Sequence, residues 1–215
     1  MEKDVNSERK PSITPTKDGP YLVKGLKDFA NQKGAVKTQK TMALCRCGGS
    51  ANKPFCDGTH ATIGFSSDKI ESRVEDKREN YKTKTITIHD NRGICSHSAR
   101  CTDGLPSVFR LDEEPWIHPD SATAEEIMTT IKKCPSGALS YSVDEIEHRD
   151  REGAPKIIIA PNGPYLVSGG PGLVEVKQGE GASKEHYTLC RCGGSKNKPF
   201  CDGTHWHINF KDDKN

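Results

Sequence analysis

Residues 44–60 read LCRCGGSANKPFCDGTH, and residues 189–205 read LCRCGGSKNKPFCDGTH. The two stretches differ at one position, where the first copy has Ala51 and the second has Lys196. Each copy holds three cysteines and one histidine but few apolar side chains that could form a hydrophobic core. Segments with so small a core are usually stabilised by disulfides or by metals. Because the whole set repeats in phase, we expect these cysteines and histidines to bind something rather than to serve as packing residues.

The repeat extends beyond these two stretches. GPYLVKG at 19–25 recurs as GPYLVSG at 163–169, so a module of about 45 residues occurs twice. In each module the Tyr-Leu-Val that follows Gly-Pro predicts a short β-strand after a turn. A second strand is predicted directly before the first cysteine of each copy, and the Gly-Gly pair that follows predicts a loop. The sequence therefore predicts two small β-rich modules, over 19–70 and 161–215.

Between the modules lies a different unit, over residues 79–143. Residues 85–88 alternate between polar and apolar types, which predicts a strand, and 139–143 predict a returning strand. Apolar residues recur at helical spacing over 123–133, and Thr123 can form a capping box with the glutamate three residues later. The pattern predicts a small domain that contains both helix and strand.

Together these elements predict an α+β protein, in which two β-rich modules flank an inserted α+β domain. The polar N-terminal residues 1–18 predict a disordered tail. The charged stretch that begins at 144 predicts an exposed linker over 144–160.

Composition excludes several classes of protein. The chain has 215 residues with 32 basic and 30 acidic side chains, a net charge of +2, so neither nucleic acid nor an anionic membrane is favoured as a partner. The longest apolar run, 157–160, is far too short to span a membrane, and the N-terminus lacks the apolar stretch of a secretory signal. Nine cysteines, clustered beside histidines, favour metal ligation in a reducing compartment over disulfides. We expect a cytoplasmic protein.

The repeated set has the spacing C-x-C-x8-C-x3-H. Its members are Cys45, Cys47, Cys56 and His60 in the first copy and Cys190, Cys192, Cys201 and His205 in the second. Structural zinc sites commonly begin with two cysteines separated by two to four residues, whereas here one residue separates them. Thiolates also suit copper(I) and iron–sulfur clusters, and a diiron cluster needs two protein ligands for each iron. The spacing supplies two such pairs, although a zinc-stabilised binding module remains an alternative.

Both copies resemble the CDGSH, or NEET, iron–sulfur domain, whose pattern is C-x-C-x2-[ST]-x3-P-x-C-D-G-[SAT]-H. Every fixed position is matched, with Ser50 and Ser195 at the [ST] place. The resemblance implies a [2Fe–2S] cluster in each copy, its inner iron held by the C-x-C pair and its outer iron by the C-x3-H pair. Relatives with one motif form homodimers, so two motifs in one chain imply an intramolecular pseudo-dimer. We therefore expect a monomer with internal pseudo-two-fold symmetry.

The remaining cysteines, Cys95, Cys101 and Cys134, lie in the middle unit. CSHSARC and the later KCPSGAL follow the C-x2-C-x2-C and Cys-Pro spacing of bacterial ferredoxins, with Ser98 in the place of the second cysteine. With GLPSVF and PWIHPD, the unit resembles the divergent single-cluster ferredoxin domain that often accompanies CDGSH motifs. The resemblance implies a ferredoxin-type cluster: either [3Fe–4S], or [4Fe–4S] with a fourth ligand for which Ser98 and His97 are the nearest candidates. A folded domain that has lost its cluster is the alternative.

These sites indicate a redox protein. A histidine ligand raises the potential of a cluster relative to four thiolates and can also take up a proton. We expect electron transfer with a reductase or an acceptor protein as partner; storage of clusters and their transfer to an apo iron–sulfur protein is the alternative. The sequence has no phosphate-binding loop, nucleophile motif or flavin or nicotinamide fingerprint, so we do not expect an enzyme.

Overall fold

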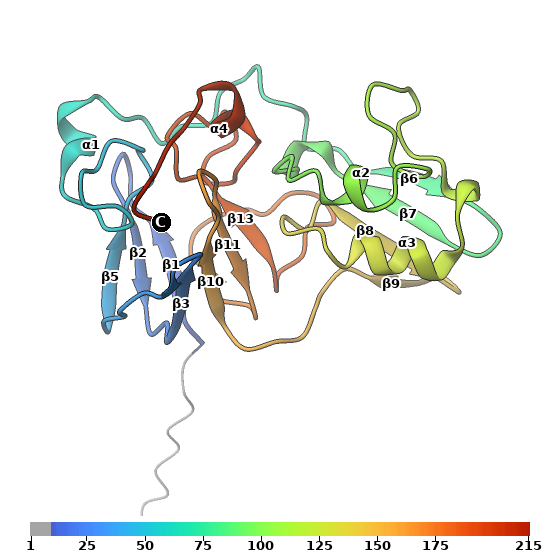
Figure 1. Ribbon diagram of the computed structural model, residues 1–215, viewed down its shortest axis with the longest axis horizontal. Helices are drawn as coiled ribbons and strands as arrows, with labels where there is room; N and C mark the ends of the chain where they lie inside the picture. Colours follow the sequence, from blue (N-terminus) through green and yellow to red (C-terminus); the bar gives the residue numbers. More distant parts are fainter. Residues whose placement is uncertain (1–9) are drawn as a thin grey trace, which may run out of the picture.

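The structure, a computed structural model, describes residues 10–215 (Figure 1). The described chain is mostly β, with three sheets and a few short helices. The two modules lie side by side, and the middle domain packs against the second of them (Figure 1). This arrangement confirms the β-rich modules and their places at both ends of the chain. Helix is concentrated in the middle domain, as its mixed pattern predicts.

The first sheet has the strand order β12-β1-β2-β5. Its strands are β1 (Ser12–Pro15), β2 (Tyr21–Lys24), β5 (Thr41–Leu44) and β12 (Gly172–Leu173). Strands β2 and β5 confirm the two strands predicted for the first module. They pair antiparallel, and their alternate side chains point into the core, among them Tyr21 and Leu44.

The second sheet has the order β13-β11-β10-β3-β4. Its strands are β13 (Tyr187–Leu189), β11 (Tyr165–Ser168), β10 (Lys156–Ile159), β3 (Asp28–Asn31) and β4 (Gly34–Ala35). Strands β11 and β13 are the predicted pair of the second module. The long apolar run at 157–160 supplies β10, whose Ile157 and Ile159 are buried.

Each sheet incorporates strands from both modules. Strand β12 pairs parallel with β1, and β3 pairs parallel with β10. One hydrophobic core therefore contains side chains of both modules. Two tyrosines form reciprocal hydrogen bonds between the modules. The Tyr21 hydroxyl donates to the carbonyls of Cys190 and Pro199 at 2.9 and 2.8 Å, and the Tyr165 hydroxyl donates to those of Cys45 and Pro54 at 2.9 and 3.1 Å.

The two cysteine loops meet backbone to backbone at the centre of this pairing. Cys47 and Cys192 form an isolated antiparallel bridge. Gly48 and Gly193 have φ of 79° and 82°, and a Cβ at either position would lie 2.4 or 2.3 Å from the carbonyl oxygen of the opposite cysteine. Only glycine fits this approach, because it lacks a Cβ and adopts positive φ without strain.

The middle domain has a sheet of order β6-β7-β8-β9. Its elements are β6 (Glu79–Lys82), β7 (Thr87–Asp90), 3-10 helix η1 (Arg92–Ile94), α2 (Arg100–Gly104), 3-10 helix η2 (Pro119–Ser121), α3 (Ala124–Ile131), β8 (Leu139–Val143) and β9 (Ile146–His148). The predicted strand at 139–143 and the capping box of Thr123 with Glu126 are confirmed. Strand β7 begins two residues later than predicted, because the Thr83 hydroxyl accepts from the amides of Thr85 and Ile86 and holds them in a turn.

Two sequence predictions about irregular segments are wrong. Of the predicted tail, residues 1–9 lie outside the described residues, whereas Ser12–Pro15 forms β1. This strand pairs with another strand on each edge, and its Ile13 side chain is completely buried. Pairing with distant segments therefore stabilises a strand whose flanking sequence is polar. The predicted linker over 144–160 contains β9 and β10. Ile157 and Ile159 of β10 are buried in the core, and β9 pairs with β8, so pairing with other strands orders a segment whose own sequence is mostly charged.

Candidate metal centres

The first CDGSH-like loop is formed by a tight return of the chain on itself. The Cys45 amide donates to the Pro54 carbonyl and the Cys56 amide to the Ala43 carbonyl, both at 2.8 Å. Cys45 and Cys47 therefore face Cys56 and the one-turn helix α1 (Thr59–Thr62), which carries His60. The second loop repeats these bonds before helix α4 (Thr204–His207), which carries His205.

In each loop the four predicted ligands form two pairs. The Sγ atoms of Cys45 and Cys47 are 3.7 Å apart, and Cys56 Sγ lies 3.4 Å from His60 Nδ1. In the second loop the corresponding distances are 3.8 and 3.4 Å. Two ligands on one tetrahedral metal, with bonds to sulfur of about 2.3 Å, lie roughly 3.8 Å apart. Each pair thus has the spacing that one tetrahedral metal atom requires.

The pairs do not merge into a site for one ion. Within residues 10–215, no group of three or more His, Cys, Asp or Glu side chains converges on a position for a single metal ion. A structural zinc ion would need all four ligands around one centre. Two separate pairs in one loop instead fit a cluster that contains two metal atoms.

Polar contacts hold each loop in this shape. The Asp57 carboxylate accepts from the amide of Ala51 at 2.7 Å and from the amide and hydroxyl of Thr59, and these bonds hold the pKa of Asp57 well below its usual range. The Ser50 hydroxyl donates to the Phe55 carbonyl at 2.7 Å. In the second loop Asp202 and Ser195 make the corresponding bonds.

Backbone amides also point at sulfur. Gly49, Gly58 and Gly194 each donate an N–H to a ligand sulfur, of Cys47, Cys56 and Cys192 respectively, at 3.4 Å. Such bonds stabilise negative charge on the sulfur, and they are one of the features that tune the potential of iron–sulfur clusters.

The two loops differ in exposure. Cys201 and His205 are 2% and 5% exposed, whereas Cys56 and His60 are only partly buried. Burial lowers the pKa of the His205 imidazole, because the charged form loses solvation. The middle domain supplies part of this cover, since His97 lies against Gly203.

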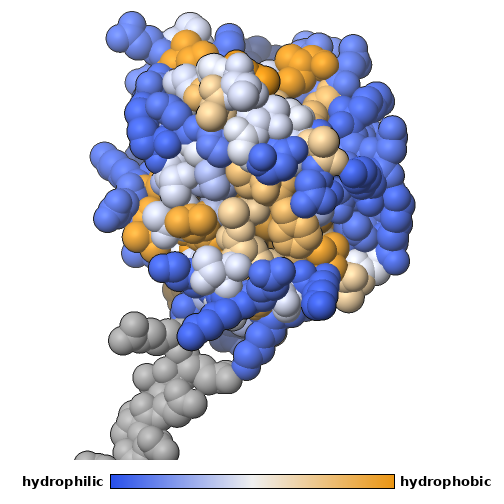
Figure 2. Space-filling model, turned by 90° about the vertical axis from the view of Figure 1, so that its left-hand side faces the viewer, coloured by the Kyte–Doolittle hydropathy of each residue, from blue (hydrophilic) through white to orange (hydrophobic). Residues whose placement is uncertain are grey.

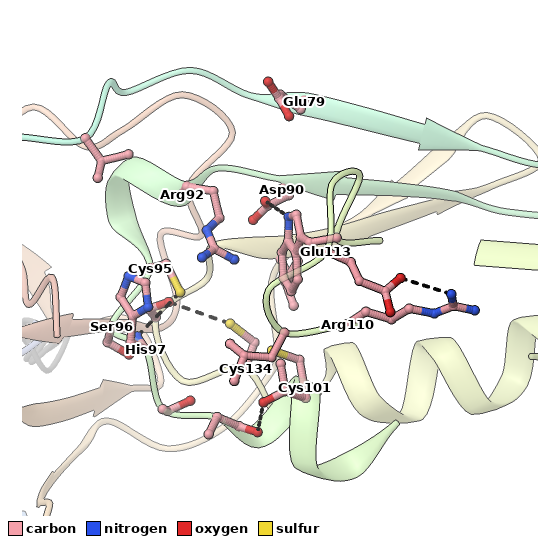
Figure 3. Close-up of a pocket in the computed structure, with 18 of the residues that line it drawn as sticks. Glu79, Asp90, Arg92, Cys95, Ser96, His97, Cys101, Arg110, Glu113 and Cys134 are labelled. Atoms are coloured by element: carbon pink, nitrogen blue, oxygen red, sulfur yellow. Dashed lines mark hydrogen bonds and ion pairs between the residues drawn. The ribbon is translucent and has the colours of Figure 1, made fainter. Parts of the chain in front are cut away.

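The three cysteines of the middle domain line one cavity of about 660 Å³ (Figure 3). Cys95 follows η1, Cys101 lies in the first turn of α2, and Cys134 follows α3. Burial raises the pKa of the Cys95 and Cys101 thiols to about 12 and 11. These thiols are therefore protonated at neutral pH in the absence of a metal, which makes them poor nucleophiles, and a metal would have to displace the protons to bind them.

Sequence reasoning missed two charged residues in this cavity. The Arg92 guanidinium lies 4.4 Å from the Trp116 ring centroid, and its charge favours the thiolate forms of Cys95 and Cys101. Trp116 Nε1 donates to the Asp90 carboxylate at 3.0 Å, and burial raises the pKa of Asp90 to about 6. No spacing rule marks either residue, since the sheet and η1 bring them to the cavity. A fixed cation fits the negative charge of a thiolate-bound cluster.

The two candidates for a fourth ligand also line the cavity but are exposed. Ser98 stands at the place where bacterial ferredoxins have their second cysteine. The His97 side chain packs against Gly203 of the second module, where an added Cβ would lie 2.9 Å from both the Cβ and the Cδ2 of His97. The structure thus brings three cysteines together and leaves His97 at the boundary with the second CDGSH loop.

The domain composition follows from comparison with known families. Residues 18–61 and 162–206 match the iron-binding zinc finger CDGSH type family, and residues 81–144 match the divergent 4Fe-4S mono-cluster family. These are iron–sulfur cluster-binding domains. The chain consists of two CDGSH domains that flank a divergent 4Fe-4S mono-cluster domain.

Among curated proteins, the chain is similar to the uncharacterized protein YjdI of Escherichia coli, in strains K12 and O157:H7. Each is 39% identical over 61 residues, which covers 28% of this chain and 80% of the relative. No solved structure matches the chain. Within residues 10–215, no helix has the length and apolar character needed to cross a membrane.

Proposed function

We propose that the protein transfers single electrons through two Cys3His-ligated [2Fe–2S] clusters and one cluster held by Cys95, Cys101 and Cys134. The observation that carries this proposal is the division of each CDGSH loop into two ligand pairs at 3.4 to 3.8 Å. The shared core and the reciprocal tyrosine bonds are the features that a single-chain pseudo-dimer requires. Such a scaffold holds the three sites at fixed separations.

When bound, iron–sulfur clusters accept and release one electron without gaining or losing a ligand. The protein provides the ligands and the hydrogen bonds to them. Each C-x-C pair would hold one iron and each C-x3-H pair the other, while the amides of Gly49, Gly58 and Gly194 donate to the sulfurs of the predicted ligands. A neutral imidazole in place of a thiolate leaves the site less negative, which raises its potential.

An enzymatic role is not part of the proposal. The 660 Å³ cavity is lined by the three middle cysteines, and the thiols of Cys95 and Cys101 have raised pKa values rather than the lowered values of catalytic nucleophiles. We propose a reductase or an acceptor protein as partner.

Cluster transfer is the second candidate function, because Cys56 and His60 of the first CDGSH loop are accessible to solvent. A histidine-ligated iron that solvent can reach is a point at which a cluster could leave, because protonation of the imidazole weakens its bond to the metal.

One experiment separates the two functions. The oxidised protein is mixed with a reduced ferredoxin that carries its own cluster and, in parallel, with an apo-ferredoxin. Electron transfer predicts stoichiometric reduction of the CDGSH clusters with no loss of iron from the chain. Iron that moves to the apo-ferredoxin, with no reduction by the holo-ferredoxin, would contradict electron transfer and support the alternative.

A further inference from the structure

The middle domain and the second CDGSH loop are in direct contact. The Trp206 indole N–H donates to the His97 carbonyl at 3.2 Å, and the Asn197 amide donates to the Gly93 carbonyl at 2.7 Å. Gly203 lies against the His97 ring. His97 is two residues from Cys95, and Gly203 is two residues from both Cys201 and His205. The contact therefore joins the ligand loop of one site to the ligand loop of the other.

Electron tunnelling decreases steeply with the separation of donor and acceptor, so neighbouring ligand loops provide a favourable path. The described contacts include no corresponding link between the middle cysteines and the first CDGSH loop.

The first CDGSH loop has a similar backbone conformation at the corresponding positions, but the middle domain does not contact it there. Gly58 corresponds to Gly203 and has φ of 90°, but nothing lies within 4 Å of a Cβ placed there. Ala61 stands where the second loop has Trp206. Figure 2 looks onto the side of the molecule that the first module forms, and no domain covers β5 and α1 there. The second CDGSH site thus lies against the middle domain, whereas the corresponding side of the first faces solvent.

We infer that the middle site and the second CDGSH site exchange electrons within the chain across the contact of His97, Gly203 and Trp206, and that the first CDGSH site exchanges electrons with an external redox protein. This inference rests on the proposed electron-transfer function. The two CDGSH sites are joined by the backbone bridge between Cys47 and Cys192, which completes the path.

The surroundings also give the path a direction. Reduction adds one negative charge to a site, and burial disfavours added charge, so the buried second site accepts an electron less readily than the exposed first site. The three ligands assigned to the middle site are all cysteines, so no imidazole among them raises the potential of this site. An external one-electron donor protein reduces the middle site, and one electron passes through the second site to the first. An external acceptor protein then takes it, and no bond forms or breaks.

The test is the electron spin relaxation of the fully loaded, chemically reduced protein. A nearby paramagnetic cluster accelerates relaxation. Each CDGSH site has the other as a neighbour, and the second also has the middle site, so the signal from the two CDGSH sites should contain a faster and a slower population in equal amounts. Cys134→Ser, which removes a ligand of the middle cluster, should decrease the relaxation rate of the fast population severalfold. His60→Cys, which alters the signal of the first site, should alter only the slow population.

A matched pair of glycine variants tests the contact itself. Gly203→Ala drives a methyl group into the His97 ring, whereas Gly58→Ala imposes the same backbone strain in open space. Gly203→Ala should slow the fast population, and Gly58→Ala should leave it unchanged. Uniform relaxation, an equal effect of both glycine variants, or a fast population that belongs to the first site would overturn the inference. The absence of reducible iron–sulfur signals would instead defeat the proposed function.

Discussion

The two CDGSH sites have nearly the same sequence but different surroundings. Within the seventeen-residue motif they differ only at Ala51 and Lys196, and their ligand distances agree within 0.1 Å. Yet His205 is 5% exposed, whereas His60 is half-buried. The motif therefore determines the ligand geometry, and its neighbours determine the exposure. A duplicated site can take on two roles without any change in its ligands.

The first prediction concerns a substitution that disrupts both CDGSH sites at once, at the backbone bridge between Cys47 and Cys192. Gly48→Ala places a Cβ 2.4 Å from the Cys192 carbonyl oxygen at a positive φ, and we expect a loss of about 4 kcal/mol in the free energy of unfolding. Urea unfolding measures the loss. Gly58→Ala is the control, since only strain of about 1 kcal/mol is expected there. Equal losses would show that the loops are not in contact.

A second prediction concerns a histidine that only the second module has. His186 is buried with Nδ1 2.8 Å from the Ser183 hydroxyl, and burial lowers its pKa to about 4, whereas the corresponding residue in the first module is Thr41. The unfolded chain therefore binds a proton more readily than the folded one, and stability falls as the pH drops from the unfolded value of about 6.5 towards 4.

Between pH 7 and pH 5 this histidine should remove about 2 kcal/mol of stability. In His186→Gln the free energy of unfolding should decrease correspondingly less over that range. Loss of the clusters in acid affects both proteins and cancels in the difference. Replacement of the exposed His207 by Gln serves as a control, and an identical effect there would contradict a role for burial.

The third prediction tests the symmetry of the core. Tyr21→Phe and Tyr165→Phe each remove a hydroxyl that bonds the opposite ligand loop, and each should lower the free energy of unfolding by about 1 kcal/mol. Because the contacts are reciprocal, the two losses should be equal within error. A large loss at one position alone would mean that the modules do not pair as equivalent halves.

Replacement of the ligand histidines should have the smallest effect on folding but a clear effect on the clusters. His60→Cys and His205→Cys should each lower the potential of the altered site and slow its bleaching at acidic pH, because a thiolate is more negative than imidazole. Visible absorbance over time at pH 5 measures the bleaching. In the unaltered protein the exposed first site should bleach sooner. Unchanged acid lability in both variants would contradict histidine ligation.

Much of the site could be predicted from the sequence, since spacing alone places Cys45 beside Cys47 and Cys56 beside His60. The strands next to the motif follow from the local pattern as well. The pairing of β1 with β12 and of β3 with β10 does not, because parallel pairing between distant segments leaves no local signal. For the same reason Ser12–Pro15 could not be recognised as a strand, nor could Arg92 and Asp90 be assigned to the middle cavity.

The proposed electron path requires three iron–sulfur clusters in one chain. The direct measurement is the iron, zinc and acid-labile sulfide content of the anaerobically purified protein, together with its visible spectrum. We predict a coloured protein that contains iron and sulfide for two [2Fe–2S] clusters and one ferredoxin-type cluster, with no stoichiometric zinc. A colourless protein that holds zinc and no sulfide would contradict the account.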